Sequence, residues 1–244
     1  MIDYHCHILP RIDDGSKTLE DSLAMARQLV IAGFRHVYCT PHCITGLYDL
    51  PVSQISASVV QLQQAVTDSG IPLLLEAGME YYSDGFFFDR LRDPMLLGDS
   101  NLLLFELPSS GDAELLPEAV SRILSHGLTP VLAHPERYFA SSRNRGSARL
   151  ARRLRRELWF EREISLPTLL LQALDMGCLL QADLGSFNGT YGKHTETFAW
   201  LLQDRGLYTY YGSDGHSPAH LERVLRDNKA LLNLEIAIKV IHST

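Results

Sequence analysis

The chain has 244 residues, of which 45% are hydrophobic and 21% charged, and its formal net charge is −7. This composition is ordinary for a globular protein and allows one large domain, and the negative charge argues against a nucleic-acid-binding protein. Four scattered cysteines without a C-x-x-C pair favour a reducing compartment over a disulfide framework. Because neither a signal-peptide pattern nor an uninterrupted apolar span of bilayer length stands out, the sequence predicts a cytoplasmic protein.

Strand-like apolar runs alternate with amphipathic helical runs from end to end. Strands are expected in the opening stretch and at residues 36–40, 72–79, 102–105, 129–133, 178–182 and 207–211. Helices are expected from residue 17, capped by Thr18, to a stop at Gly33, and at residues 52–68, 113–126, 166–176, 196–204 and 219–231, before a final apolar run at 234–241. Such alternation implies parallel strands joined by right-handed crossovers.

Seven strands rich in Val, Leu and Ile are typical of a sheet that is covered on both faces. The sequence therefore predicts an α/β fold in one domain over residues 1–244. A closed or nearly closed βα-barrel is the expected architecture, and an open doubly wound sheet is the alternative.

Metal-binding residue types stand at or just past the C-terminal end of six of the seven expected strands. Each one alone has an ordinary explanation, such as helix capping or a salt bridge, but in βα-barrels this end carries the active site. The coincidence indicates a metal centre. Its candidate ligands are His5, His7, His42, Glu80, Glu106, His134, Asp214 and His216.

Seven or eight imidazoles and carboxylates exceed the number that one ion needs, so two or three ions are implied. Histidine and carboxylate ligands without thiolate leave manganese, iron and zinc all open. Sites with several such ions act on phosphate esters, where a bound hydroxide attacks and the ions neutralise the phosphoryl oxygens.

Six motifs of the chain match a known family in the right order. They are His5-Cys6-His7, Asp13-Asp14-Gly15, Thr40-Pro41-His42, Gly78-Met79-Glu80, Ala133-His134-Pro135-Glu136-Arg137-Tyr138 and Ser213-Asp214-Gly215-His216. The chain resembles the polymerase and histidinol phosphatase (PHP) superfamily. More narrowly, it is similar to the bacterial manganese-dependent tyrosine-protein phosphatase branch (CpsB/CapC/YwqE-like), and the resemblance runs from residue 1 to about 216.

The resemblance implies a distorted seven-stranded (β/α)7 barrel of the PHP type that holds up to three divalent ions, typically Mn²⁺. The implied assignment gives the first ion to His5, His7, Glu80 and Asp214, the second to Glu80, Glu106 and His134, and the third to Asp14, His42 and His216. Cys43 stands where a second histidine is expected in many relatives.

A hydroxide that bridges the ions would attack the phosphorus in line. Asp14 and His216, on the substrate side, and Arg137 are the residues expected to act on the substrate. The Arg137 guanidinium can contact phosphate through two N–H groups, and its alternative is a surface salt bridge with Glu136. The glycine-rich stretch at residues 185–192 is expected to form a wall of the substrate site.

The resemblance implies a phosphotyrosine-protein phosphatase. Its expected substrate is the tyrosine-rich tail of a bacterial tyrosine kinase that regulates capsular or exopolysaccharide synthesis. A small-molecule phosphatase such as histidinol phosphatase is the alternative. A nuclease is less favoured, because the ligand-bearing face lacks a run of basic and aromatic residues. A catalytically silent binding module is the remaining hypothesis, and the complete ligand set argues against it.

A basic helical insertion is expected at about residues 139–165. Residues 143–162 carry eight of the 22 basic residues against two acidic ones, and three leucines recur there every four residues. Such a helix can be a solvated surface helix. It can also be a surface that contacts an acidic partner or an anionic membrane.

Overall fold

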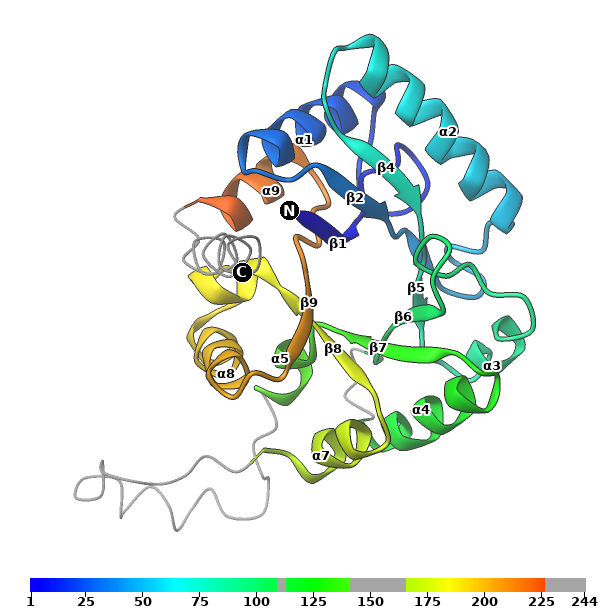
Figure 1. The fold of residues 1–244 in the computed structure, drawn as a ribbon, viewed down its shortest axis with the longest axis vertical. Coiled ribbons are helices and arrows are strands. Elements are labelled where there is room, and N and C mark those ends of the chain that lie inside the picture. The colour runs from blue at the N-terminus through cyan, green and yellow to red at the C-terminus, as the bar shows by residue number, and fades with distance from the viewer. Residues whose placement is uncertain (109–112, 141–165, 227–244) are drawn as a thin grey trace, which may run out of the picture.

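Parallel strands form the centre of the molecule, and helices lie around them (Figure 1). The structure, a computed structural model, describes residues 1–108, 113–140 and 166–226. Its strands are β1 (Ile2–Cys6), β2 (His36–Cys39), β3 (His42–Cys43), β4 (Leu74–Ala77), β5 (Glu80–Tyr82), β6 (Leu102–Glu106), β7 (Thr129–Ala133), β8 (Leu179–Asp183) and β9 (Tyr208–Gly212).

The helices connect these strands. They are α1 (Leu19–Ile31), α2 (Val52–Asp68), α3 (Phe87–Arg90), η1 (Ala113–Leu115), α4 (Leu116–Ser125), α5 (Pro135–Phe139), α7 (Thr168–Asp175), η2 (Leu184–Asn188), α8 (Lys193–Asp204) and α9 (Pro218–Leu225). On α2 the buried residues follow helical spacing at Ile55, Val59, Leu62 and Val66. One stripe of this helix therefore packs on the strands while the rest faces outward.

The strands form two sheets, β1-β2-β4 and β3-β5-β6-β7-β8-β9, in which every ladder is parallel. This confirms the mixed α/β fold and the parallel strands predicted from the alternation. The first and last strands also meet at their ends. The backbone N–H of Asp214 donates to the carbonyl of His5 over 2.7 Å, and that of His7 donates to the carbonyl of Gly215 over 3.0 Å.

The strands predicted at 36–40 and 72–79 are each followed in the structure by a further short strand, β3 and β5. Thr40 and Pro41 separate β2 from β3, and Gly78 and Met79 separate β4 from β5. Proline has no N–H to donate to a ladder, which favours an interruption at this point. Because both neighbours break at the same level, β3 pairs with β5 beyond the break, and His42 lies opposite Glu80.

Each of the seven expected strand positions holds a strand, and the Thr18 cap is confirmed by its side chain, which accepts from the N–H of Asp21. The helix expected at 219–231 ends at Leu225 as α9, because the backbone of Arg226 is extended, and residues 227–231 lie outside the described residues. Helix α8 begins three residues before the expected 196, and the short helices α3 and α5 were not predicted. Residues 141–165, most of the predicted basic insertion, and the apolar run at 234–241 lie outside the described residues.

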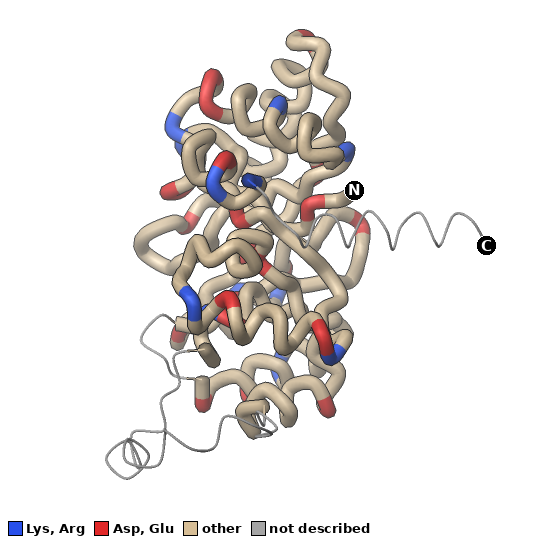
Figure 2. Tube along the Cα trace, turned by 90° about the vertical axis from the view of Figure 1, so that its left-hand side faces the viewer, with Lys and Arg blue, Asp and Glu red and all other residues tan. Residues whose placement is uncertain are grey.

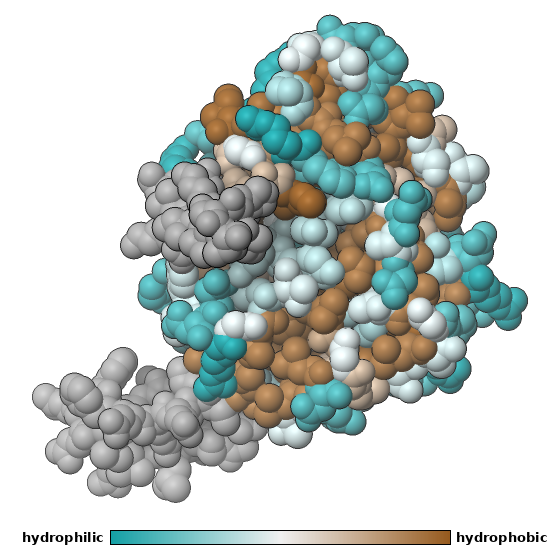
Figure 3. Space-filling model, viewed as in Figure 1, coloured by the Kyte–Doolittle hydropathy of each residue, from teal (hydrophilic) through white to brown (hydrophobic). Residues whose placement is uncertain are grey.

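The surface of the described part mixes residue types. Figure 2 shows acidic and basic residues scattered along the chain, and Figure 3 shows hydrophobic and hydrophilic residues interspersed on one face. Among the described residues, no helix is both long enough and apolar enough to cross a membrane.

Candidate metal centre

Four buried side chains from opposite ends of the chain meet at the ends of β1, β5 and β9. His5 Nε2 lies 3.2 Å from Glu80 Oε2 and 3.3 Å from Asp214 Oδ1, and His7 Nε2 lies 3.3 and 3.1 Å from the same two atoms. The two Nε2 atoms are 3.1 Å apart. Donor atoms at this spacing surround a point roughly 2 Å from each of them, which is the usual length of a metal–ligand bond.

The local backbone explains how His5 and His7 reach one point. Side chains two residues apart on an extended segment face the same side, and Cys6 between them is fully buried in the core on the other side. Gly212 of β9 allows close approach to β1, because a Cβ on this residue would lie 2.4 Å from the Cβ of His5.

The second nitrogen of each histidine has its own partner. His5 Nδ1 lies 2.9 Å from Gln181 Oε1, and His7 Nδ1 lies 2.7 Å from Asp13 Oδ2. Asp13 Oδ2 also accepts from the backbone N–H of His42. Such partners fix the ring orientation of a metal-binding histidine and leave Nε2 directed at the ion.

A second group is more accessible to solvent. Asp14 Oδ1 lies 3.5 Å from both His42 Nε2 and His216 Nε2, and the side chain of Asp14 is 50% exposed. His216 Nδ1 is hydrogen bonded to the carbonyl of Asp214, which directs the opposite nitrogen at Asp14. His7, Asp14, His42 and His216 each offer a ligand atom to this group.

Glu80 links the buried group to a third one. His42 Nδ1 lies 2.9 Å from Glu80 Oε2 and 3.3 Å from Glu106 Oε1, so the two nitrogens of His42 face different groups. His134 Nε2 lies 3.0 Å from Glu80 Oε1, and its backbone adopts the left-handed conformation directly before α5.

The electrostatics of the centre favour cations. Burial is the largest single effect and would lower the pKa of His5 and of His42. The neighbouring carboxylates, Glu80 with Asp214 at His5 and Glu80 with Glu106 at His42, together outweigh it and raise both pKa values, that of His42 to about 10. Burial would raise the pKa of Glu80, yet His5 and His42 hold it well below its usual range. Ionised carboxylates therefore persist in a buried site, which is stable only with compensating positive charge.

Arg137 supplies part of that positive charge. Its Nη2 donates to the carboxylates of Asp183 and Asp214, and its guanidinium lies 4.0 Å from the centroid of the Tyr191 ring. Burial works against this charge, but the two carboxylates raise the pKa of Arg137 well above its usual range. Arg137 is thus the positive neighbour of the carboxylate of Asp214, a candidate ligand.

The alternative of a surface salt bridge between Arg137 and Glu136 is wrong. Glu136 is fully buried, where it accepts from the Tyr208 hydroxyl over 2.9 Å and from the backbone N–H of Asp183 over 2.9 Å. Burial, and then the charge of Asp183, raises the pKa of Glu136. Glu136 therefore supports the end of β8, which carries Asp183 toward Arg137.

The donor set fits divalent ions. Buried atoms without a hydrogen-bond partner among the described residues include Glu80 Oε2, Asp214 Oδ1, His42 Nδ1 and His134 Nδ1. Buried polar atoms normally have such partners, and the first three face the shared spaces between the groups. Histidine and carboxylate donors suit Mn²⁺, Fe²⁺ and Zn²⁺.

Comparison with known proteins agrees with this geometry. A family model described as "Capsular polysaccharide synthesis, CpsB/CapC" matches residues 1–151. The chain belongs to the CpsB/CapC family. Tyrosine-protein phosphatase YwqE of Bacillus subtilis is 30% identical over 219 residues, which are 89% of this chain and 78% of that protein. Tyrosine-protein phosphatase CpsB of Streptococcus pneumoniae is 27% identical over 224 residues, covering 89% and 83%.

Solved structures extend the match in three dimensions. A chain from the crystal structures of YwqE and CpsB, described as metal-dependent tyrosine phosphatases, has a TM-score of 0.73 and 29% identity, covering 96% of this chain and 87% of that one. The phosphotriesterase homology protein of Escherichia coli has a TM-score of 0.53 and 12% identity, covering 99% and 91%, and supports the fold alone.

All nine predicted ligands of this CpsB/CapC-family chain lie in or beside the three groups. His134 contacts the centre through Glu80, and Glu106 is grouped with His42 rather than with His134. The sequence did not predict the residues that orient the site: Asp13 contacts His7, Gln181 contacts His5, and Asp183 contacts Arg137. In the sequence, Asp13 stands out only as a turn residue. Gln181 lies within the strand expected at 178–182 and Asp183 follows it, so no local pattern marks either as a partner of the site.

Proposed function

We propose that this chain is a metal-dependent tyrosine-protein phosphatase that acts in capsular polysaccharide synthesis. The observation that carries the proposal is the buried group of His5, His7, Glu80 and Asp214, with its donor atoms 3.1–3.3 Å apart. The relatives named tyrosine-protein phosphatase, which match most of the chain, supply the substrate class. No observation favours histidinol phosphatase.

The proposed ligands form one centre that holds three ions. His5, His7, Glu80 and Asp214 hold the buried ion, Glu80 with Glu106 and His134 a second, and Asp14, His42 and His216 a third. When bound, such ions lower the pKa of water and neutralise phosphoryl oxygens. Manganese is the proposed ion, and iron and zinc have the same donor preference.

The residues of the chain have separate tasks in the proposed reaction. Asp13 and Gln181 orient His7 and His5 through their second nitrogens. Arg137 holds Asp214 and keeps that carboxylate ionised. Its N–H groups other than Nη2, among them the buried Nε that has no partner among the described residues, are the proposed phosphate donors. The leaving phenolate has an ordinary pKa of about 10, so no dedicated acid is needed.

The proposal extends to the architecture and the partner. The backbone hydrogen bonds between the ends of β1 and β9 support one distorted seven-stranded barrel made of both sheets. The proposed substrate is the tyrosine-rich tail of a bacterial tyrosine kinase. We retain the prediction of one domain over residues 1–244, with the basic segment at 143–162 as a contact surface.

A matrix of metals and substrates tests the function. The wild-type protein is treated with a chelator, reloaded with Mn²⁺, Fe²⁺ or Zn²⁺, and given a phosphotyrosine peptide or histidinol phosphate. We expect hydrolysis of the peptide that depends on the added metal. Strong turnover of histidinol phosphate with none of the peptide would contradict the proposal.

The double variant His5→Ala, His7→Ala tests the site. It should lose more than about a hundredfold in activity, beyond the loss expected from a supporting contact alone. The matched control is His126→Ala, because His126 is exposed at the end of α4, away from the centre. Retained activity in the double variant would remove the metal assignment.

A further inference from the structure

The accessible side of the metal centre is where a phosphoryl group can enter. The side chains of His5, His7, Glu80 and Asp214 are 0–3% exposed, whereas those of His42, His216 and Asp14 are 13%, 24% and 50% exposed. A substrate that reaches the ions must therefore approach past the Asp14 side. Whatever is attached to its phosphorus then lies against the side chains that surround this entrance.

Tyr48 lies at this entrance. Its ring is stacked on that of His42, with the centroids 6.0 Å apart and an interplanar angle of 15°. Among the described residues, no hydrogen bond holds the hydroxyl group of Tyr48. One flank of the ring is thus supported by a candidate ligand.

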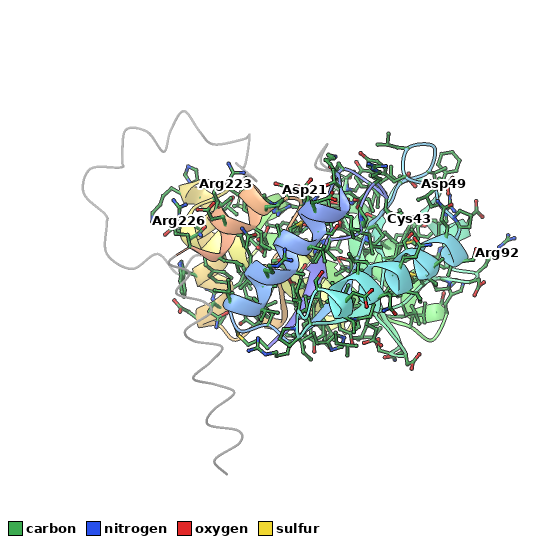
Figure 4. The ribbon with its side chains drawn as sticks, turned by 90° about the horizontal axis from the view of Figure 1, so that it is seen from above. Asp21, Cys43, Asp49, Arg92, Arg223 and Arg226 are labelled. Atoms are coloured by element: carbon green, nitrogen blue, oxygen red, sulfur yellow. The ribbon has the colours of Figure 1, made fainter. Side chains whose placement is uncertain are left out.

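The loop that carries Tyr48 is fixed by hydrogen bonds. Ile44 and Tyr48 exchange two backbone bonds of 3.0 and 2.9 Å, and Gly46 at the tip has a positive φ of 80°, which glycine adopts without strain. In Figure 4, Asp49 of this loop and Asp21 of the first turn of α1 lie along the same upper edge of the molecule. The loop is therefore ordered before any substrate arrives.

Arg90, the last residue of α3, joins this loop to the segment after β5. Its guanidinium contacts the carboxylate of Asp49 and donates to Thr45 Oγ1 over 3.3 Å. Two apolar side chains stand exposed on the linked loops, Leu47 at 66% and Phe86 at 60%. Leu47 and Phe86 are therefore apolar side chains open to solvent on the two segments that Arg90 joins.

A second tyrosine, Tyr191, is already engaged on the Arg137 side of the centre. The face of the Tyr191 ring covers the guanidinium of Arg137, and its hydroxyl lies 3.1 Å from His220 Nε2. Tyr191 therefore supports Arg137, and Tyr48 is the better candidate to contact an aromatic substrate.

We propose that Tyr48, together with the exposed Leu47 and Phe86 of the two segments that Arg90 joins, forms the surface that receives the phenyl ring and the flanking residues of a phosphotyrosine peptide. The inference rests on the proposed function and adds to it a residue that determines specificity. A ring beside the entrance gains contact with Tyr48, whereas a short alkyl phosphate cannot reach it. Contacts between aromatic rings favour offset or edge-to-face packing, and the half-buried Tyr48 ring offers both.

The variants Tyr48→Ala and Tyr48→Phe test the proposal. Tyr48→Ala should raise KM for a phosphotyrosine peptide about tenfold with little change in kcat, the upper range for one aromatic contact. Tyr48→Phe should keep the wild-type KM, because the ring and not the hydroxyl makes the contact. Val60→Ala is the control, since Val60 is 69% exposed on α2, outside the entrance.

Two further measurements separate ring binding from support of the centre. The inhibition constant of inorganic phosphate, which has no ring, and the bound metal per chain should both stay within about twofold in Tyr48→Ala. Calorimetry with a non-hydrolysable phosphonate analogue of the peptide should give the same tenfold loss as KM.

Two outcomes in Tyr48→Ala would overturn the inference. An unchanged KM in Tyr48→Ala means that Tyr48 does not contact the ring, and a parallel loss of phosphate binding or of metal means that it supports His42. Wild-type protein that fails to hydrolyse the phosphotyrosine peptide would refute the proposed function itself, so the two failures are distinguishable.

Discussion

At the scale of residues, the candidate centre consists of ligands and of the groups that orient them. His5, His7 and His216 each use one ring nitrogen for a neighbour and direct the other at a shared space. The sequence identified the histidines, because their residue type and their place after strands are visible along the chain. It could not identify Gln181 as the partner of His5, because only the fold brings two residues 176 positions apart into contact.

The adjacent carboxylates of Asp13 and Asp14 illustrate the same limit. The sequence reading assigned the ligand role to Asp14 and gave Asp13 only a place in the turn. In the structure the two side chains point to different partners, Asp13 to His7 Nδ1 and Asp14 to His42 and His216. Although the two residues are adjacent in the chain, Asp13 orients the candidate ligand His7 and Asp14 faces the entrance.

Replacement of Asp13 should weaken metal binding. In Asp13→Ala the His7 ring loses its 2.7 Å partner and the backbone N–H of His42 loses its acceptor. Loss of such an orienting contact typically costs 10–100-fold in metal affinity, so a fall of about that size is expected in competition with a chelating dye. Asp68→Ala, at the exposed end of α2, is the control. Equal affinity in the two variants would mean that Asp13 does not orient His7.

At the scale of elements, apolar runs and glycine stops located most of the structure. Helix α2 matches its expected range at both ends. The short strands β3 and β5, which follow breaks after β2 and β4, were not predicted, because two or three residues are too few to show a pattern along the chain. These breaks matter, since beyond them His42 and Glu80 become cross-strand partners.

The contact between β1 and β9 should be sensitive to added volume. In Gly212→Ala the new Cβ would lie 2.4 Å from the Cβ of His5 and 2.8 Å from Gln181 Nε2, so the strands must move apart. Overpacking of this kind typically costs about 1–3 kcal/mol, and the urea midpoint of the metal-free protein should fall accordingly. Gly85→Ala is the control, because its Cβ would meet nothing within 4 Å. A Gly212→Ala midpoint equal to that of the control would show that the strands do not pack as closely as described.

At the scale of the whole molecule, the alternation of strands and helices predicted parallel pairing, and all strand ladders in the described part are parallel. Because the strands are parallel, the carboxylates carried by β5, β6 and the end of β9 all lie on the same side of the sheets, close to one another. Glu80 and Asp214 are held ionised although both are buried, and Arg137 contacts the carboxylate of Asp214. Without an ion, protonated His5 and His42, whose pKa values are raised, supply part of the compensating charge, and bound cations would supply it instead.

Removal of metal should therefore destabilise the entire domain. An ion that binds only the folded chain adds about 2.7 kcal/mol when its concentration is a hundredfold above Kd. For a chain of this length that amounts to roughly 5–10 °C in Tm. We expect scanning calorimetry to give a Tm lower by about that much in excess chelator than in excess Mn²⁺, and a much smaller difference for His5→Ala, His7→Ala. A wild-type Tm that is identical with and without metal would mean that the buried carboxylates are compensated within the chain.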